Sequence, residues 1–293
     1  MIKQQQDLPG CPLKYLYIYY LKGRVAPDTD LHQPDFIGNW EEDGFSFLFY
    51  TRPCSERIDA ILNDQPQLTL LDAYQMPYAE WLGEKPTTIF AGRLIIAPPW
   101  EKDLEANSST GDHLRLVLNP GVVFGTGTHV TTRDCLKAIE SIYANASHPL
   151  RTLDLGTGTG VLALAAAALG SCRTLAVDFN FLAARTAAEN VRLNRMENRI
   201  LSVQGKAEQL INCPADLLIA NIHYDVMHQI IQTTGFRQKK WFVLSGLLRS
   251  QAVIVADILT ESGADILNQW EGDGIWHTLM GNNPQGYPVD SFR

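Results

Sequence analysis

A glycine-rich segment, 153–160, constrains this chain more than any other part of its sequence. It reads LDLGTGTG and stands between a short apolar run and a stretch rich in alanine and leucine. Glycines let the backbone turn sharply, allow a ligand to approach without a Cβ atom in the way, and aim free amide N–H groups at a polar or anionic group. The pattern therefore predicts a β-strand, a ligand-binding turn and a helix in succession.

The rest of the chain after Leu150 repeats this alternation of short apolar runs and longer helical patterns, which is typical of an α/β fold with a parallel sheet. A closing antiparallel hairpin is expected around the turn 271–274. The predicted strands are 151–155, 174–177, 200–203, 216–220, 241–244, 264–270 and 275–280. The predicted helices are 161–169, 182–193, 224–233 and 249–262, with a further helical stretch that runs to Ile142.

The front of the chain has a different texture and indicates a separate α+β module. Its strands are expected at 13–21, 45–49 and 67–71, with a helix at 55–63 before the last of them. A length of 293 residues exceeds the usual size of one compact core. We therefore predict three parts, listed in chain order: an N-terminal α+β domain at 1–77, a linker at 78–91, and an α/β domain at 92–293 that opens with strands at 93–100 and 114–118.

Charge is unevenly distributed along the chain. Residues 1–105 hold 9 Lys plus Arg against 16 Asp plus Glu, a net charge of −7, whereas the other 188 residues hold 15 against 16. An acidic surface repels phosphate backbones and attracts a basic partner. The composition argues against nucleic-acid binding and favours a cationic protein partner, although a solvated acidic surface that only maintains solubility is an equal alternative.

Targeting and metal-binding signals are missing from the sequence. The polar start 1–10 lacks the apolar core of a secretory signal, and no run of about 18 apolar residues could span a bilayer. The five cysteines are scattered without C-x-x-C spacing, so we expect neither a disulfide framework nor a metal site. We predict a cytoplasmic protein without membrane association.

The details of the glycine turn argue against a dinucleotide cofactor such as NAD or FAD and against the phosphate-binding loop of ATPases. A dinucleotide fingerprint requires glycine or alanine at the place that Val161 occupies, and the phosphate-binding loop of ATPases requires a Gly-Lys-Ser/Thr ending that is missing here. Asp178 ends the second predicted strand about twenty residues later, where a carboxylate can accept hydrogen bonds from ribose hydroxyls. Its alternative role is that of a helix N-cap.

Two further polar segments are expected at the same edge of the sheet. Asn221 closes the fourth predicted strand and should converge with Gly156 and Asp178, because ligands collect at the carboxyl ends of strands in an open wound sheet. Upstream, the segment 119–129 reads NPGVVFGTGTH and precedes a helix. Such a loop can close over a cofactor, or it can be a surface turn in which Thr128 or Thr131 caps the helix.

Taken together, these motifs resemble the family of ribosomal large-subunit protein eleven methyltransferases (PrmA), whose members carry D-P-G-x-A-F-G-T-G-x-H, D-x-G-x-G-x-G, N-I-L-A and L-S-G-I-L. The matching segments are 119–129, 154–160, 221–222 and 244–248, and the segment 92–100 ends in the family's Pro-Pro-Trp. The resemblance covers roughly 78–280. It implies a Rossmann-like, seven-stranded class I methyltransferase domain behind a small ferredoxin-like domain for substrate recognition.

The resemblance also implies S-adenosyl-L-methionine as the cofactor and a ribosomal protein as the substrate. The expected cofactor-binding residues are Phe124, Thr126, Gly127, Thr128, Asp154, Gly156, Thr157, Gly158, Asp178, Phe179 and Asn221. Three departures from the family pattern are Asn119 in place of Asp, Val123 in place of Ala, and His223-Tyr224 in place of Leu-Ala. The third stands beside the expected position of the reacting methyl group.

An enzyme of this kind would methylate an amine, either a lysine side chain or an N-terminus. As a hypothesis, Asn221 orients the amine through its carbonyl oxygen, and His129, His223 or Tyr224 relays the proton. One alternative is a methyltransferase for a nucleobase or another amide nitrogen, because the segment 221–224 echoes an N-P-P-Y motif without its prolines. A second alternative is a non-catalytic module that binds the cofactor without turnover.

Overall fold

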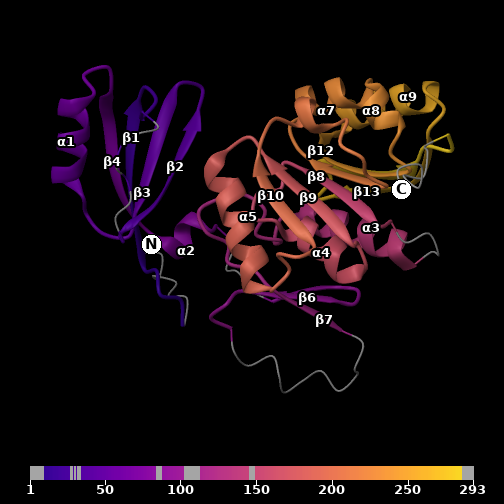
Figure 1. The fold of residues 1–293 in the computed structure, drawn as a ribbon, viewed down its shortest axis with the longest axis horizontal. Helices are drawn as coiled ribbons and strands as arrows, with labels where there is room; N and C mark the ends of the chain where they lie inside the picture. The colour runs from indigo at the N-terminus through magenta and orange to yellow at the C-terminus, as the bar shows by residue number, and fades with distance from the viewer. Residues whose placement is uncertain are drawn as a thin grey trace. The chain divides into compact units, whose positions relative to one another are not determined.

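The computed structural model describes residues 10–26, 29, 31, 34–83, 88–101, 113–144 and 149–285 (Figure 1). The chain divides into two compact units, 1–85 and 86–293, which are described separately here. No helix among the described residues is long and apolar enough to cross a membrane.

The N-terminal unit contains one antiparallel sheet in the order β2-β3-β1-β4. Its elements are β1 (Tyr15–Lys22), β2 (Phe36–Glu42), β3 (Phe45–Tyr50), α1 (Ser55–Asp64), β4 (Thr69–Pro77) and α2 (Tyr78–Trp81). This is the strand order of a ferredoxin-like fold. Within the described residues, the crossover from β3 to β4 carries a helix, α1, and the crossover from β1 to β2 carries none.

One face of this sheet packs on α1. The apolar core there joins side chains of β1 and β3, such as Leu21 and Leu48, to Ile58 and Ile61 of the helix. Strand β2 was not predicted, because its residues mix polar and charged side chains with only three apolar ones. It forms nonetheless, since the tight turn at Asp43, where φ is 49°, pairs it with β3 as a hairpin.

The C-terminal unit is built on a seven-stranded sheet in the order β10-β9-β8-β11-β12-β14-β13. The first five strands in this order are parallel, and β14 pairs antiparallel with both β12 and β13. The strands are β8 (Arg151–Leu155), β9 (Arg173–Asp178), β10 (Ile200–Gln204), β11 (Leu217–Asn221), β12 (Trp241–Leu248), β13 (Asp265–Gly272) and β14 (Trp276–Asn282). The predicted strands and the closing hairpin are confirmed, with boundaries that differ by a few residues.

Helices cover both faces of this sheet, as Figure 1 shows. One apolar core packs α3 (Val130–Ala144), α4 (Val161–Leu169) and α5 (Phe181–Leu193) against one face. A second core packs the opposite helices on the other face. Those helices are α6 (Ala207–Leu210), α7 (Tyr224–Ile231), α8 (Thr234–Arg237) and α9 (Arg249–Glu261). Because both faces are buried, the central strands are almost wholly apolar.

A small three-stranded sheet precedes α3 in the chain. It consists of β5 (Ile89–Ala91), β6 (Leu94–Ala97) and β7 (Leu114–Val117), and β6 pairs antiparallel with β5 and parallel with β7. The described residues of the segment 78–91, predicted to be the linker between the two domains, include helix α2 and strand β5. Both are only three or four residues long, too short for a periodic pattern to reveal.

Candidate functional site

The glycine turn after β8 adopts a backbone that only glycine accommodates without strain. Gly156 and Gly158 have φ angles of 72° and 55°. A Cβ atom on Gly156 would lie 2.2 Å from Ile222 Cγ2, and one on Gly158 would lie 2.4 Å from the Phe124 carbonyl oxygen. The turn is therefore pressed between the end of β11 and the loop that contains Phe124.

Asp154, the last residue but one of β8, is fully buried and only half satisfied. Its Oδ2 atom accepts a 2.6 Å hydrogen bond from the Thr157 hydroxyl, while Oδ1 is buried without a hydrogen-bond partner. Burial, with a smaller contribution from nearby Asp178, raises the pKa of the Asp154 carboxyl to about 7, although the Thr157 hydroxyl and the Ala163 backbone amide oppose this shift. A buried carboxylate oxygen without a partner is suited to a positively charged group of a ligand.

Asp178 at the end of β9 binds the backbone of the glycine turn. Its Oδ2 atom accepts a hydrogen bond from the Gly158 amide, and its Oδ1 atom accepts one from the Asn180 amide, each 3.0 Å long. Burial raises the pKa of the Asp178 carboxyl, and these two hydrogen bonds oppose the shift. The N-cap of α5 is Asn180, whose side chain accepts from Leu182 N, so the N-cap alternative for Asp178 is wrong.

Phe179 follows Asp178 and presents its ring to solvent, with 56% of the residue exposed. Its carbonyl oxygen accepts a hydrogen bond from Gln204 at the end of β10. An exposed aromatic ring next to a buried carboxylate is a surface on which a planar base can stack.

The loop 119–129 lies against the glycine turn. The Phe124 carbonyl accepts a 3.2 Å hydrogen bond from the Thr159 amide, and the Thr159 hydroxyl donates to the Gly125 carbonyl. Phe124 itself is 58% exposed. The hydroxyl groups of Thr126 and Thr128 are 2.9 Å apart. The predicted residues of this loop are thus adjacent to the predicted residues of the turn.

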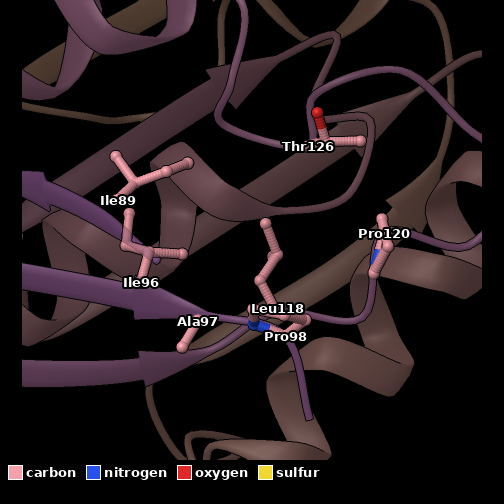
Figure 2. Close-up of a pocket in the computed structure, with 7 residues that line it drawn as sticks. All are labelled: Ile89, Ile96, Ala97, Pro98, Leu118, Pro120 and Thr126. Atoms are coloured by element: carbon pink, nitrogen blue, oxygen red, sulfur yellow. The ribbon is translucent and has the colours of Figure 1, made fainter. Parts of the chain in front are cut away.

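A small apolar pocket lies where this loop meets the three-stranded sheet (Figure 2). Its lining residues are Ile89, Ile96, Ala97, Pro98, Leu118, Pro120 and Thr126. Ile89 also limits Gly127, because a Cβ atom there would lie 2.6 Å from its Cδ1 atom. Strand β5 therefore contacts the loop at Gly127, and residues of β5 and β6 line the pocket beside the loop.

Asn190, which was not predicted as a site residue, joins the loop to the glycine turn. Its Nδ2 atom donates to the carbonyls of Asn119 and Thr159, each at 2.9 Å, and its Oδ1 atom accepts from the Asn119 amide at 2.8 Å. The residue is fully buried in α5. A polar side chain on the inward face of an apolar helical pattern is the sequence signal that could have indicated this role.

Asn221 ends β11 beside Gly246 of β12. An ideal Cβ atom on Gly246 would lie 3.1 Å from both Asn221 Oδ1 and the Ile222 carbonyl oxygen. Gly246 has a φ of 84°, which disfavours any side chain there. Two acceptor oxygens therefore converge on one point that the glycine keeps open.

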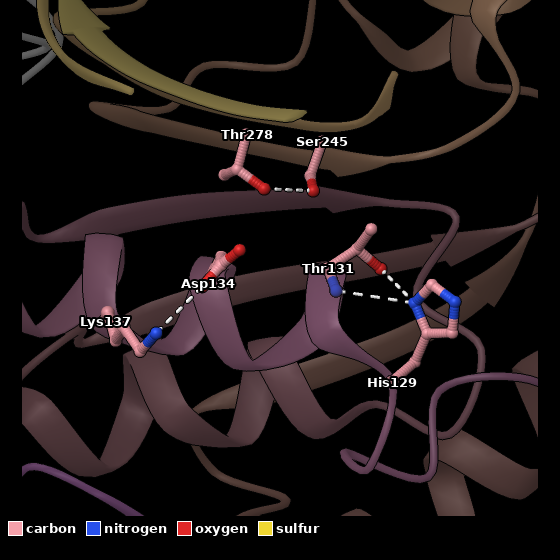
Figure 3. Close-up of polar contacts among 6 residues, drawn as sticks. All are labelled: His129, Thr131, Asp134, Lys137, Ser245 and Thr278. Atoms are coloured by element: carbon pink, nitrogen blue, oxygen red, sulfur yellow. Dashed lines mark hydrogen bonds and ion pairs between the residues drawn. The ribbon is translucent and has the colours of Figure 1, made fainter. Parts of the chain in front are cut away.

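The three candidates for proton relay differ in their surroundings. Asn221 Nδ2 donates to Thr131 Oγ1 at 3.2 Å, and Thr131 Oγ1 is 2.8 Å from His129 Nδ1 (Figure 3), which links His129 to Asn221. The His223 side chain is 77% exposed, caps α7 and lies 3.5 Å from Asp225. The Tyr224 ring contacts His228 of its own helix, with centroids 5.5 Å apart.

Trp276, also not predicted, completes the surroundings of His129. The imidazole ring stands edge-on between Phe124 and Trp276, with ring centroids 5.5 Å and 5.6 Å away. Trp276 begins β14, which pairs with β12 close to Gly246. An isolated tryptophan after a turn gives no sequence signal of this contact.

The sheet and the residues at the carboxyl ends of its strands together define a class of protein. The strand order, the single antiparallel strand β14 between β12 and β13, and the glycine turn after the central strand β8 are those of the Rossmann-like class I methyltransferase fold. A family model described as ribosomal protein L11 methyltransferase (PrmA) matches residues 78–284. The chain belongs to this family, and the predicted resemblance is confirmed.

Individual relatives agree with this membership. A ribosomal protein L11 methyltransferase from Clostridium botulinum is 34% identical over 198 residues, which cover 67% of this chain and 60% of the relative. One from Listeria innocua is 29% identical over 266 residues, covering 83% of this chain and 81% of the relative. The chain thus spans about 60% of the length of the first relative and more of the second.

Among solved structures, the chain is similar to a ribosomal protein L11 methylase from Lactobacillus delbrueckii subsp. bulgaricus. The TM-score is 0.57 at 28% identity, with 67% of this chain and 98% of that chain covered. Methyltransferases of this family use S-adenosylmethionine.

Proposed function

We propose that this chain transfers a methyl group from S-adenosylmethionine to an amine nitrogen of a protein, and that the protein is a ribosomal one. Family membership supports the class of reaction, and the name of the relatives, ribosomal protein L11 methyltransferase, supports the substrate. The observation that carries the proposal is the pair of acceptor oxygens that converge beside Gly246.

The polar groups around the glycine turn fit the parts of S-adenosylmethionine. Asp154 Oδ1 lacks a partner and would accept from the ammonium of the methionine moiety. Asp178 uses only one lone pair of each oxygen on backbone amides, so it retains acceptor capacity for ribose hydroxyls. Phe179 would stack on the adenine, while Phe124, Thr126, Gly127 and Thr128 would cover the cofactor from the loop side.

The acceptor pair at the end of β11, beside Gly246 of β12, fits an amine. Asn221 Oδ1 and the Ile222 carbonyl would accept two N–H bonds from the nucleophile, which directs its lone pair away from them. Both oxygens belong to neutral groups. They therefore hold the amine without stabilising its protonated form, as a neighbouring carboxylate would do.

Deprotonation is the harder step for a lysine substrate. With a reference pKa of about 10.4, supplying the neutral amine at pH 7 costs about 4.6 kcal/mol, against about 1 kcal/mol for an α-amine near 7.8. When bound, S-adenosylmethionine supplies an electrophilic methyl group on a positively charged sulfur. The neutral amine would take this methyl group, with the thioether as the leaving group, and would then lose a proton, for which His129 is the candidate relay closest to Asn221 in the hydrogen-bond network.

The N-terminal sheet supports a basic protein as the partner. A cross-strand row on the face opposite α1 runs through Trp40, Phe47, Tyr20 and Asp72, which are paired in register on neighbouring strands. The rings of Tyr20 and Phe47 are stacked at 4.5 Å, and Trp40 Nε1 donates to Glu42. Aromatic rings flanked by carboxylates attract lysine and arginine side chains.

The two units of the chain would thus have different roles. The unit before the linker would recognise the substrate protein, and the seven-stranded unit would carry out the transfer. An acidic front third disfavours direct nucleic-acid binding, and a ribosomal substrate places the reaction in the cytoplasm. Tyr224 is turned to His228, which gives no support to base stacking as in a nucleobase methyltransferase.

The proposal is tested with purified protein, radiolabelled S-adenosylmethionine and the ribosomal proteins separated from one another. We expect label on one basic protein, and a fall in kcat of about 10²–10³-fold for Asn221→Ala with unchanged cofactor affinity by calorimetry. Label that appears in RNA instead favours the nucleobase alternative. Cofactor binding without transfer to any protein or RNA favours a non-catalytic module, and undiminished turnover of Asn221→Ala removes the role of that residue.

A further inference from the structure

We propose that Thr131 is a positioning residue that turns the Asn221 carbamoyl group so that Oδ1 faces the substrate amine. The inference rests on the proposed function and extends it to a residue on the first turn of α3. Thr131 is 2% exposed, and the hydrogen bond that joins it to Asn221 spans 90 positions of sequence.

The backbone N–H of Thr131, which can only donate, fixes the donor and acceptor roles in the hydrogen bonds from His129 through Thr131 to Asn221. The Thr131 backbone N–H points at His129 Nδ1 across 3.4 Å, so Nδ1 is an acceptor and the proton of the neutral imidazole is on Nε2. The Thr131 hydroxyl, 2.8 Å from the same nitrogen, must then be the donor of that contact as well.

The orientation of Asn221 is the consequence. Because the Thr131 hydroxyl hydrogen is directed to His129, the lone pairs of Oγ1 are left to accept from Asn221, and only the Nδ2 end of the carbamoyl group can donate. With Nδ2 bound in this way, Oδ1 lies beside Gly246, 3.1 Å from the ideal Cβ position there. The rotated amide would instead present two N–H groups to an amine, which repels its hydrogens.

The rings around His129 hold the start of this chain in place. Phe124 and Trp276 flank the imidazole at interplanar angles of 61° and 71°. Edge-to-face contacts of this kind restrict rotation of the ring. The Nδ1 atom therefore stays directed at the first turn of α3.

Thr131→Ser supplies the matched control. Serine keeps the hydroxyl that links His129 to Asn221 and loses only the methyl group, whereas Thr131→Val keeps the volume and removes the hydroxyl. Only Thr131→Val removes the link to Asn221.

The experiment compares the affinities of S-adenosylhomocysteine and sinefungin by isothermal titration calorimetry. Sinefungin has an amine-bearing carbon in place of the sulfur, so its N–H groups report on acceptors at the site of methyl transfer. We expect wild-type protein to prefer sinefungin, and the preference to fall about tenfold in Thr131→Val. Thr131→Ser, which keeps the hydroxyl, should retain the wild-type preference within about twofold.

Kinetics give a second readout. In the same variants, kcat for methyl transfer should fall about tenfold for Thr131→Val with an unchanged KM for S-adenosylmethionine, and Thr131→Ser should restore it. A wild-type preference in Thr131→Val overturns the positioning role, as does an equal loss in Thr131→Ser. Wild-type protein that binds neither compound overturns the proposed function itself, and with it the role of Thr131.

Discussion

The two halves of the candidate site contain different kinds of chemical group. The proposed cofactor half, at the ends of β8 and β9, consists of a glycine turn and two buried carboxylates, Asp154 and Asp178, whose pKa values are both raised by burial. The proposed amine half, at the end of β11 beside Gly246 of β12, consists of neutral oxygens, one of which a side chain of α3 orients. The first half thus presents carboxylates and a tight backbone turn. The second half presents neutral oxygens, and a network of side-chain hydrogen bonds orients the Asn221 amide.

The difference matches what each half has to bind. S-adenosylmethionine carries a positive charge on its ammonium, whose desolvation the buried Asp154 carboxylate would offset, while Asp178 would accept from the ribose hydroxyls. The nucleophile must lose a proton, and a carboxylate beside it would oppose that loss. Changes in the first half should therefore alter cofactor affinity, and changes in the second half should alter kcat.

Among the changes that should lower cofactor affinity, Gly158→Ala should have the largest effect. Its Cβ atom would lie 2.4 Å from the Phe124 carbonyl, so the loop must move away from the turn. We expect the affinity for S-adenosylmethionine to fall on the order of 100-fold, about 2.7 kcal/mol, in calorimetry. Gly263→Ala is the control, because Gly263 has a positive φ of 84° with nothing within 4 Å. An equal loss in the control would mean that backbone strain alone, and not the clash, weakens binding.

Asp154→Asn should lower cofactor affinity about 30-fold, because it removes the charge that faces the ammonium. It should also change the pH dependence of stability without ligand. The pKa of Asp154 is raised from 3.8 to about 7, so the folded state keeps a proton that the unfolded state has released.

The free energy of unfolding therefore decreases as the pH rises from about 4 to about 7. The contribution of the Asp154 proton, complete below the unfolded pKa, is lost above the folded one. Asp178 acts in the same direction, since its pKa is also raised. Melting temperatures between pH 4 and pH 8 should show a shallower decline for Asp154→Asn than for wild type, and an identical decline would contradict the assignment.

Gly246→Ala should affect the other half. The added methyl group would occupy the point on which Asn221 Oδ1 and the Ile222 carbonyl converge, each 3.1 Å away. We expect kcat to fall about tenfold while the affinity for S-adenosylmethionine stays within about twofold of wild type. Steady-state kinetics and calorimetry on the same preparation separate the two quantities. A loss of cofactor affinity as large as that of Gly158→Ala would contradict the assignment of separate cofactor and amine halves.

The cofactor half was largely predictable from sequence, because each of its parts is a local pattern. The glycine turn and the acid after the second strand are recognisable from spacing, and strand β8 and helix α4 have the predicted boundaries. The buried strands are continuous apolar runs bounded by turn residues, which is the strongest signal that a parallel sheet gives.

The amine half was harder to predict from the sequence, because its hydrogen bonds and ring contacts join residues far apart in the chain. Asn221 was predicted from its place at a strand end, but Thr131, Gly246 and Trp276 act through contacts that no local pattern encodes. The same reason explains Asn190, which joins segments 71 and 31 positions away. Strand β2 was missed for another reason, since an edge strand with mixed side chains lacks clear alternation.

His223→Ala should have the smallest effect and decides between the candidate relays. The His223 side chain is 77% exposed and its contacts are to Asp225 on the same helix. An exposed capping contact of this kind contributes little, so we expect kcat within about twofold of wild type. His129→Phe keeps an aromatic ring between Phe124 and Trp276 but removes Nδ1, and should lower kcat about tenfold through Thr131 and Asn221. If His223→Ala lowers kcat more than His129→Phe, the proton leaves through the exposed helix start and the link from α3 to Asn221 is not the route.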